Sequence, residues 1–140
     1  MAVAESFLFQ QCQILQVHLG KWYVIEYHIN MKEIVYCTTI DGKCPFQEWL
    51  NKLDSIKQKR IRQRLLRVQL GNFGDCKPLQ NSELSELRFI TNKGYRVYYK
   101  ELDNVIVLIL AGGDKSDQTQ TIKKANKYFD EFKERYYTTE

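Results

Sequence analysis

The sequence predicts an α+β fold, in which a small, mainly antiparallel four-stranded sheet packs against two N-terminal helices and a C-terminal helix. Three observations predict it. Two short segments within residues 86–99 alternate apolar and polar residues, the pattern of half-buried strands. Residues 105–110 are apolar without alternation, as in a strand covered on both faces. Apolar residues recur at helical spacing in segments before and after these strands, so the predicted order is β-α-α-β-β-β-α.

The composition fits one globular domain: 140 residues, 44% hydrophobic and 27% charged, with a net charge of +4. The four cysteines have no CxxC or other metal-ligand spacing, so we expect free thiols, no metal and no cofactor. No apolar run approaches the roughly 18 residues of a membrane span, and no secretory signal is recognisable. We therefore expect a cytoplasmic protein that makes no membrane contact.

Residues 1–30 have the least regular pattern in the chain. Residues 6–19 can form a short helix and residues 21–29 a strand. Met31 is an alternative start, because residues 31–140 form a complete domain in this interpretation. We expect an N-terminal extension at 1–30 that is not native, the alternative being a functional extension, followed by the domain at 31–140.

The predicted elements of the domain begin with a strand over residues 33–39, which is rich in β-branched and aromatic residues. Pro45 suits the first turn of a helix. Asp54 or Ser55 can cap a second helix that runs to about Leu70 and ends at the two glycines of residues 71–75. After the buried strand, Asp117 can cap the final helix, with Gln120 completing a capping box.

The second helix carries a basic stripe, and no acidic residue occurs from residue 55 to residue 74. The stripe lies beside an apolar one made by Ile61, Leu65 and Val68. A solvated helix face is one interpretation, and a contact with a polyanion is the other. On the second interpretation Arg60 and Arg64 bind RNA; the whole stripe is Lys57, Arg60, Arg64 and Arg67.

The two alternating segments predict a hairpin in which opposed residue numbers sum to 184. This register places Leu87 opposite Val97 on one face, and Arg88 opposite Arg96 on the other. Two opposed arginines repel each other, so we expect an anion-binding site there. The alternative is a structural network in which acids such as Glu86 neutralise the arginines.

Further residues extend this predicted site. Lys115 leaves the buried strand toward the same region, and Lys77 directly precedes the hairpin. Arginine forks and lysine ammonium groups suit phosphate. Tyr98, which shares the face of Glu86 in this register, can stack a nucleobase.

Both histidines, His18 and His28, precede residue 31, so the domain has no histidine acid–base pair. Cleavage of RNA by attack of a 2′-hydroxyl is still chemically accessible without a metal. It needs cations that stabilise charge on the phosphate, with Glu86, Lys77 or Lys115 transferring protons.

Four motifs in order resemble the RelE/ParE toxin superfamily, and its HigB-like branch of phage-derived addiction-module killer proteins in particular. They are GNFGD at 71–75, SELR at 85–88, GYRVY at 94–98 and GGDK at 112–115. The resemblance spans residues 31 to 128. It implies a RelE-like fold and a bacterial toxin that cleaves mRNA on the ribosome, with Arg96, Arg88 and Lys115 as catalytic residues. The implied partners are an antitoxin of the helix-turn-helix kind, mRNA and the ribosome, and operator DNA through the antitoxin.

One family feature is missing, because Ile122 stands near the position of the tyrosine that RelE carries in its last helix. The resemblance therefore implies two alternatives as well. One is a ParE-like toxin that inhibits gyrase without hydrolysing RNA. The other is an inactive relative that binds only its antitoxin and operator DNA.

Overall fold

The computed structural model describes residues 12–17, 21–26 and 31–137, and the chain divides into two compact units, Met1–Asn30 and Met31–Glu140. In the first unit, β1 (Cys12–Val17) pairs antiparallel with β2 (Lys21–Glu26). The predicted helix is therefore wrong for residues 12–17, because hydrogen bonding to a second strand overrides the weak local pattern. The strand predicted over 21–29 is present at 21–26, and the rest of both predicted segments lies outside the described residues.

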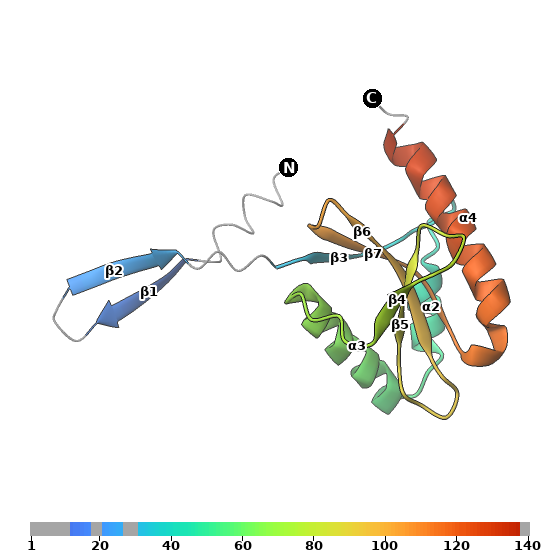
Figure 1. Cartoon of the computed structure of the whole chain (residues 1–140), viewed down its shortest axis with the longest axis horizontal. Helices are drawn as coiled ribbons and strands as arrows, with labels where there is room; N and C mark the ends of the chain where they lie inside the picture. Colours follow the sequence, from blue (N-terminus) through green and yellow to red (C-terminus); the bar gives the residue numbers. More distant parts are fainter. Residues whose placement is uncertain (1–11, 18–20, 27–30, 138–140) are drawn as a thin grey trace. The chain divides into compact units, whose positions relative to one another are not determined.

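The second unit holds a five-stranded mixed sheet and three helices, so its class is α+β (Figure 1). Strand β3 runs parallel to β7, and all other neighbours in the order β3-β7-β6-β5-β4 are antiparallel. The elements are β3 (Glu33–Tyr36), α2 (Pro45–Asn51), α3 (Ser55–Gln69), β4 (Cys76–Pro78), β5 (Ser85–Arg88), β6 (Arg96–Leu102), β7 (Ile106–Gly113) and α4 (Gln118–Tyr137), with a 3-10 turn at Lys115–Asp117.

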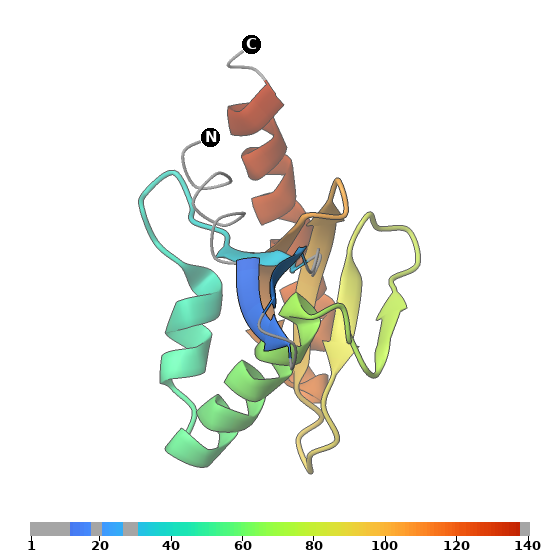
Figure 2. The same cartoon turned by 90° about the vertical axis from the view of Figure 1, so that its left-hand side faces the viewer.

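The sheet has one strand more than the sequence predicted. Strand β4 is three residues long and lies at the sheet edge opposite β3 (Figure 2). It was missed because it is short, exposed and contains Pro78, which central strands exclude and edge strands tolerate. Its pairing with β5 sets Lys77 opposite Glu86.

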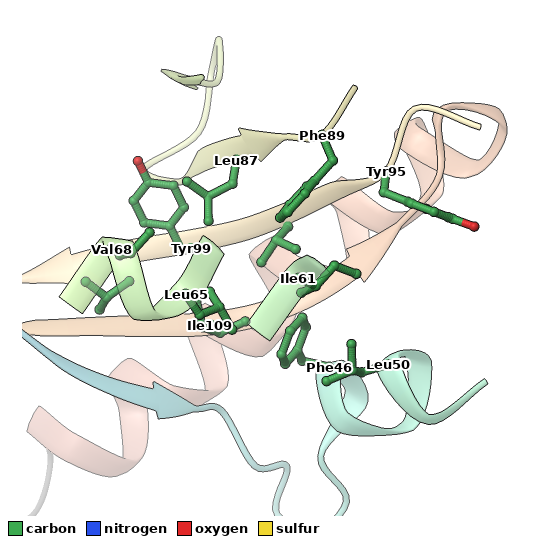
Figure 3. Close-up of a cluster of buried hydrophobic side chains, with 12 residues drawn as sticks. Phe46, Leu50, Ile61, Leu65, Val68, Leu87, Phe89, Tyr95, Tyr99 and Ile109 are labelled. Carbon is green, nitrogen blue, oxygen red and sulfur yellow. The ribbon is translucent and has the colours of Figure 1, made fainter. Parts of the chain in front are cut away.

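Helices α2 and α3 cover one face of the sheet, and α4 covers the other (Figures 1 and 2). Strand β6 shows the alternation directly, since Val97 and Tyr99 pack toward α3 whereas Tyr98 packs toward α4. Figure 3 shows the α3 side of this core, including Phe46, Leu50, Ile61, Leu65, Val68, Leu87 and Phe89. The predicted apolar stripe of α3 is confirmed as its buried face.

A β-bulge interrupts the pairing of β6 with β7. Tyr98 lies opposite Ala111, whereas Tyr99 lies opposite Ile109, so Leu110 is the extra residue. Leu110 and Ala111 consequently both pack on the α4 side. On the C-terminal side of the bulge, the last residues of β7 stay paired with β6, and Gly113 lies opposite Arg96.

The capping residue predicted for α3 is confirmed. The Asp54 side chain accepts a hydrogen bond from the Lys57 amide at 2.9 Å and caps α3. Before the last helix, Asp114 caps the 3-10 turn, because its carboxylate accepts from the amides of Ser116 and Asp117. The chain thus enters α4 through the 3-10 turn that carries Lys115.

Candidate anion-binding site

A pocket of about 400 Å³ opens beside the hairpin that joins β5 to β6. Arg88 ends β5, Arg96 begins β6, and Lys115 begins the 3-10 turn, so three separate elements bring three cations to one cavity. Its acidic member is Asp75, and the hairpin loop supplies residues 89–92 and 94. The pocket therefore joins three of the predicted site residues.

The predicted hairpin register is confirmed. Arg88 lies opposite Arg96, Leu87 opposite Val97 and Glu86 opposite Tyr98. The Phe89 amide donates to the Tyr95 carbonyl at 3.0 Å, which continues the pairing past the strand ends. Both arginines thus project from the same face, as the alternation of the two segments predicted.

The loop is held against the turn that carries Lys115. The Lys115 amide donates to the Lys93 carbonyl at 3.0 Å. Gly94 has φ +64°, and a Cβ there would lie 3.2 Å from the Lys115 Cβ. A side chain at this position would meet both backbone strain and crowding, so glycine allows the close approach.

Arg88 is neutralised by Asp75 rather than left to repel Arg96. Its Nε and Nη2 atoms donate to Asp75 Oδ1 at 2.9 and 2.6 Å. Asp75 precedes β4, and the Arg88 amide in turn donates to the Asp75 carbonyl at 2.8 Å. Both groups are partly exposed, so an incoming phosphate can share the guanidinium with Asp75.

Arg96 faces a different acid. Its Nε lies 3.7 Å from Glu86 Oε2, and its Nη1 donates to the Tyr95 carbonyl at 3.4 Å. Among the described residues, the buried Nε has no hydrogen-bond partner. Gln118, at the start of α4, donates to the same Glu86 oxygen at 3.5 Å. Arg96 therefore lines the pocket, whereas Glu86, its ion-pair partner, does not.

Glu86 is only 2% exposed and does not line the pocket. The role expected for it in transferring protons to or from RNA needs access that this position does not give. A buried carboxylate is stable when a cation and donors face it, and Arg96 and Gln118 supply them. Glu86 is consequently placed as a positioning residue for Arg96.

Tyr98 is fully buried under α4, so the expected stacking of a nucleobase on its ring is contradicted. The pKa of Tyr98 is raised to about 12, first by burial and second by the negative charge of Glu86, while the positive charge of Arg96 acts in the opposite direction. The hydroxyl has no hydrogen-bond partner within the described part of the chain. The sequence register placed Tyr98 correctly on the face of Glu86, but could not show that α4 covers it.

Arg64 is also placed differently from the sequence interpretation. Its three donating nitrogens bind backbone carbonyls of Phe73, Asp75 and Arg88 at 2.8, 2.9 and 3.1 Å. The guanidinium lies 5.1 Å from the Phe89 ring centroid, and burial lowers the pKa of Arg64. Its three nitrogen atoms join α3 to the edge of the sheet, which gives Arg64 a structural role beside the RNA contact expected from the sequence.

The remaining predicted residues lie away from this pocket. Lys77 is exposed on β4, opposite Glu86, and does not line the cavity. Arg60 is exposed on α3 and lines a separate cavity. The sequence interpretation missed Asp75 as the partner of Arg88 and Gln118 as a donor to Glu86. These two contacts join residues that are 13 and 32 positions apart, and no local pattern in the sequence predicts such contacts.

Over residues 31–137 and the two described strands before them, no three His, Cys, Asp or Glu side chains gather in a way that suits a metal ion. No helix among the described residues has the length and apolar character needed to cross a membrane.

Comparison with known proteins identifies one close relative by sequence. An uncharacterized protein of Haemophilus influenzae is 47% identical over 81 residues, which make up 57% of this chain and 81% of the relative. The chain belongs to the same family as this H. influenzae protein. No protein-family model matches the chain.

A solved structure of the E. coli toxin RelE in the free state aligns with a TM-score of 0.49 and 15% sequence identity. The alignment covers 67% of this chain and 97% of that chain. At this level of similarity, neither an activity nor a site follows from the alignment.

Proposed function

We propose that this chain is the toxin of a bacterial type II toxin–antitoxin system, with a RelE-like fold and a place in the HigB-like branch of the RelE/ParE superfamily. On this proposal it is a cytoplasmic, metal-independent endoribonuclease that cuts mRNA on the ribosome and is neutralised by an antitoxin. The observation that carries the proposal is the pocket where Arg88, Arg96 and Lys115 converge. Three of the four sequence motifs that resemble that superfamily contain these three residues, and the fourth, at 71–75, ends on Asp75 of the same pocket.

The pocket suits the charge that develops during phosphodiester cleavage. When a 2′-hydroxyl attacks the adjacent phosphorus, negative charge grows on the phosphate oxygens, and fixed cations stabilise it. Arg96 suits this role because it lines the pocket and its Nε lies 3.7 Å from the Glu86 carboxylate, an ion pair that orients the guanidinium. Arg88 adds a second guanidinium, which it shares with Asp75.

The groups of the pocket that can transfer protons to and from RNA are Asp75 and Lys115. Asp75 is the carboxylate that lines it, so we assign the proton of the attacking 2′-hydroxyl to Asp75. Lys115 is the exposed lysine of the same pocket, and we assign to it the proton that the departing 5′-oxygen receives. This assignment replaces Glu86, which is buried, and Lys77, which lies outside the pocket.

The test is induced expression in bacteria, with growth measured and mRNA 5′ ends mapped. We expect growth arrest and new 5′ ends in phase with codons. Lys115→Ala removes an exposed cation, and Arg96→Lys keeps a charge beside Glu86 but loses the planar fork. Both variants are expected to abolish the cuts, whereas Lys123→Ala, an exposed lysine of α4, leaves them unchanged. Intact mRNA in cells whose growth is arrested would refute the nuclease.

A gyrase-inhibiting toxin of the ParE kind, without nuclease activity, is the second candidate. One observation favours it: Arg88 and Arg96 each face an acid, which lowers the net positive charge of the pocket. This candidate predicts DNA damage together with intact mRNA in the same expression experiment. Growth inhibition by the Lys115→Ala variant would also support it.

A further inference from the structure

A second pocket of about 530 Å³ lies on the other side of the hairpin loop. Three cations line it, two of them from α3 and one from the loop: Lys57, Arg60 and Lys93. Ile56, Ile90 and the Tyr95 ring line it as well. No part of the cleavage chemistry described above uses this cavity.

The two pockets are neighbours that share one wall. Residues Ile90, Thr91 and Asn92 line both cavities. Ile90 is 93% exposed, so the loop stands as a ridge between them. The backbone hydrogen bond between Lys115 and Lys93 ties a cation of the first pocket to one of the second. A chain molecule that crosses this ridge can occupy both.

The charges of the second pocket favour an anion. Its acid, Asp54, is already paired with Lys57, whose Nζ lies 3.1 Å from the carboxylate. Arg60 and Lys93 have no ion pair within residues 31–137, and both are exposed. Arg60 and Lys93 can therefore bind an anionic ligand, and guanidinium and ammonium groups both bind phosphate.

The apolar part of the pocket favours a ligand that also has a flat apolar group. Ile56 is 74% exposed and belongs to the same cavity as Ile90. Tyr95 lines the cavity from the core side, since it is only 4% exposed and Lys57 Nζ lies 5.8 Å from its ring centroid (Figure 3). The accessible apolar surface is therefore that of Ile56 and Ile90, and apolar side chains of this kind pack against an unpaired nucleobase while neighbouring cations contact its phosphate.

We propose that the second pocket binds the nucleotide next to the one whose phosphate occupies the first pocket. The ligand is then single-stranded RNA of at least two nucleotides that crosses the hairpin loop at Ile90. A duplex keeps its bases paired and cannot place one against Ile56 and Ile90. This inference rests on the proposed function and names a subsite for the substrate of that function.

The test measures fluorescence anisotropy of a labelled 2′-O-methyl hexaribonucleotide, which cannot be cleaved by 2′-hydroxyl attack, binding to the full chain. The double variant Arg60→Ala/Lys93→Ala is expected to bind about tenfold more weakly, with a salt slope smaller by about 0.7 for one lost phosphate contact. A double variant of two exposed lysines outside both pockets, Lys59→Ala/Lys123→Ala, is the matched control and is expected to lose less than twofold.

A second probe separates the two pockets. A 3′-mononucleotide is expected to have the same dissociation constant in wild type and in Arg60→Ala/Lys93→Ala, calculated from its displacement of the hexanucleotide, because it occupies the first pocket alone. The inference is overturned if Arg60→Ala/Lys93→Ala matches the control, or if double-stranded RNA binds as tightly as the single strand. Failure of the proposed function looks different: wild type then cuts no mRNA in cells, whatever the affinities.

Discussion

Removing the Arg64 side chain tests whether this residue holds the fold together or binds RNA. Arg64 donates to three backbone carbonyls, and its guanidinium lies over the Phe89 ring. Hydrogen bonds from charged donors contribute about 1.5–3 kcal/mol each when buried, and we take about 1 kcal/mol because water reaches this partly buried site. Arg64→Ala is therefore expected to lower the free energy of unfolding by about 3 kcal/mol.

The assay is urea unfolding followed by far-UV circular dichroism. For a denaturant slope of about 2 kcal/mol/M, the loss lowers the midpoint by about 1.5 M urea. Arg62→Ala is the matched control, since Arg62 is an exposed arginine of the same helix, and its change is expected to stay within about 0.5 kcal/mol. The reasoning is refuted if both variants unfold alike while Arg64→Ala weakens binding of the hexanucleotide probe.

Three further predictions follow from local geometry. Hydrogen bonds led by the Ser116 hydroxyl hold the pKa of Asp114 below its ordinary value of 3.8, so Asp114→Ala is expected to cost about 1 kcal/mol at pH 7. Gly112→Ala places a Cβ 2.2 Å from the Trp49 ring and is expected to cost at least about 2 kcal/mol, partly restored by adding Trp49→Leu. Burial raises the pKa of the Cys37 thiol, so Cys37 is expected to react with iodoacetamide more slowly than Cys76, as followed by peptide mass spectrometry.

The sign of the Asp114 effect is fixed by its lowered pKa. A carboxylate of this kind stabilises the fold above its unfolded pKa, and the stabilisation is lost as pH falls through the folded value. The difference between wild type and Asp114→Ala should therefore vanish at low pH in thermal unfolding, and a constant difference would contradict the capping role. Wild-type stability in Gly112→Ala, or equal reactivity of the two thiols, would contradict the other two predictions.

Part of the site could be predicted from the sequence, because the position of Arg88 opposite Arg96 depends on the register of the β5–β6 hairpin. Alternating residues in two adjacent strands fix which side chains share a face, so the pairing of Arg88 with Arg96 followed from the sequence. The sequence also named Glu86 as an acid that can neutralise these arginines, and Glu86 lies 3.7 Å from Arg96. The sequence did not show that Asp75, which precedes a very short edge strand, binds Arg88, or that Gln118 of the last helix donates to Glu86.

The sequence by itself determined the α+β class, the hairpin register and the buried stripe of α3, because all three depend on local periodicity of apolar residues. Only the tertiary structure decided which polar groups stay accessible. Packing of α4 buries Tyr98, and backbone carbonyls of the loop after α3 and of the end of β5 accept hydrogen bonds from Arg64. Accessibility depends on contacts between residues far apart in the chain, and a periodic pattern carries no information about those contacts.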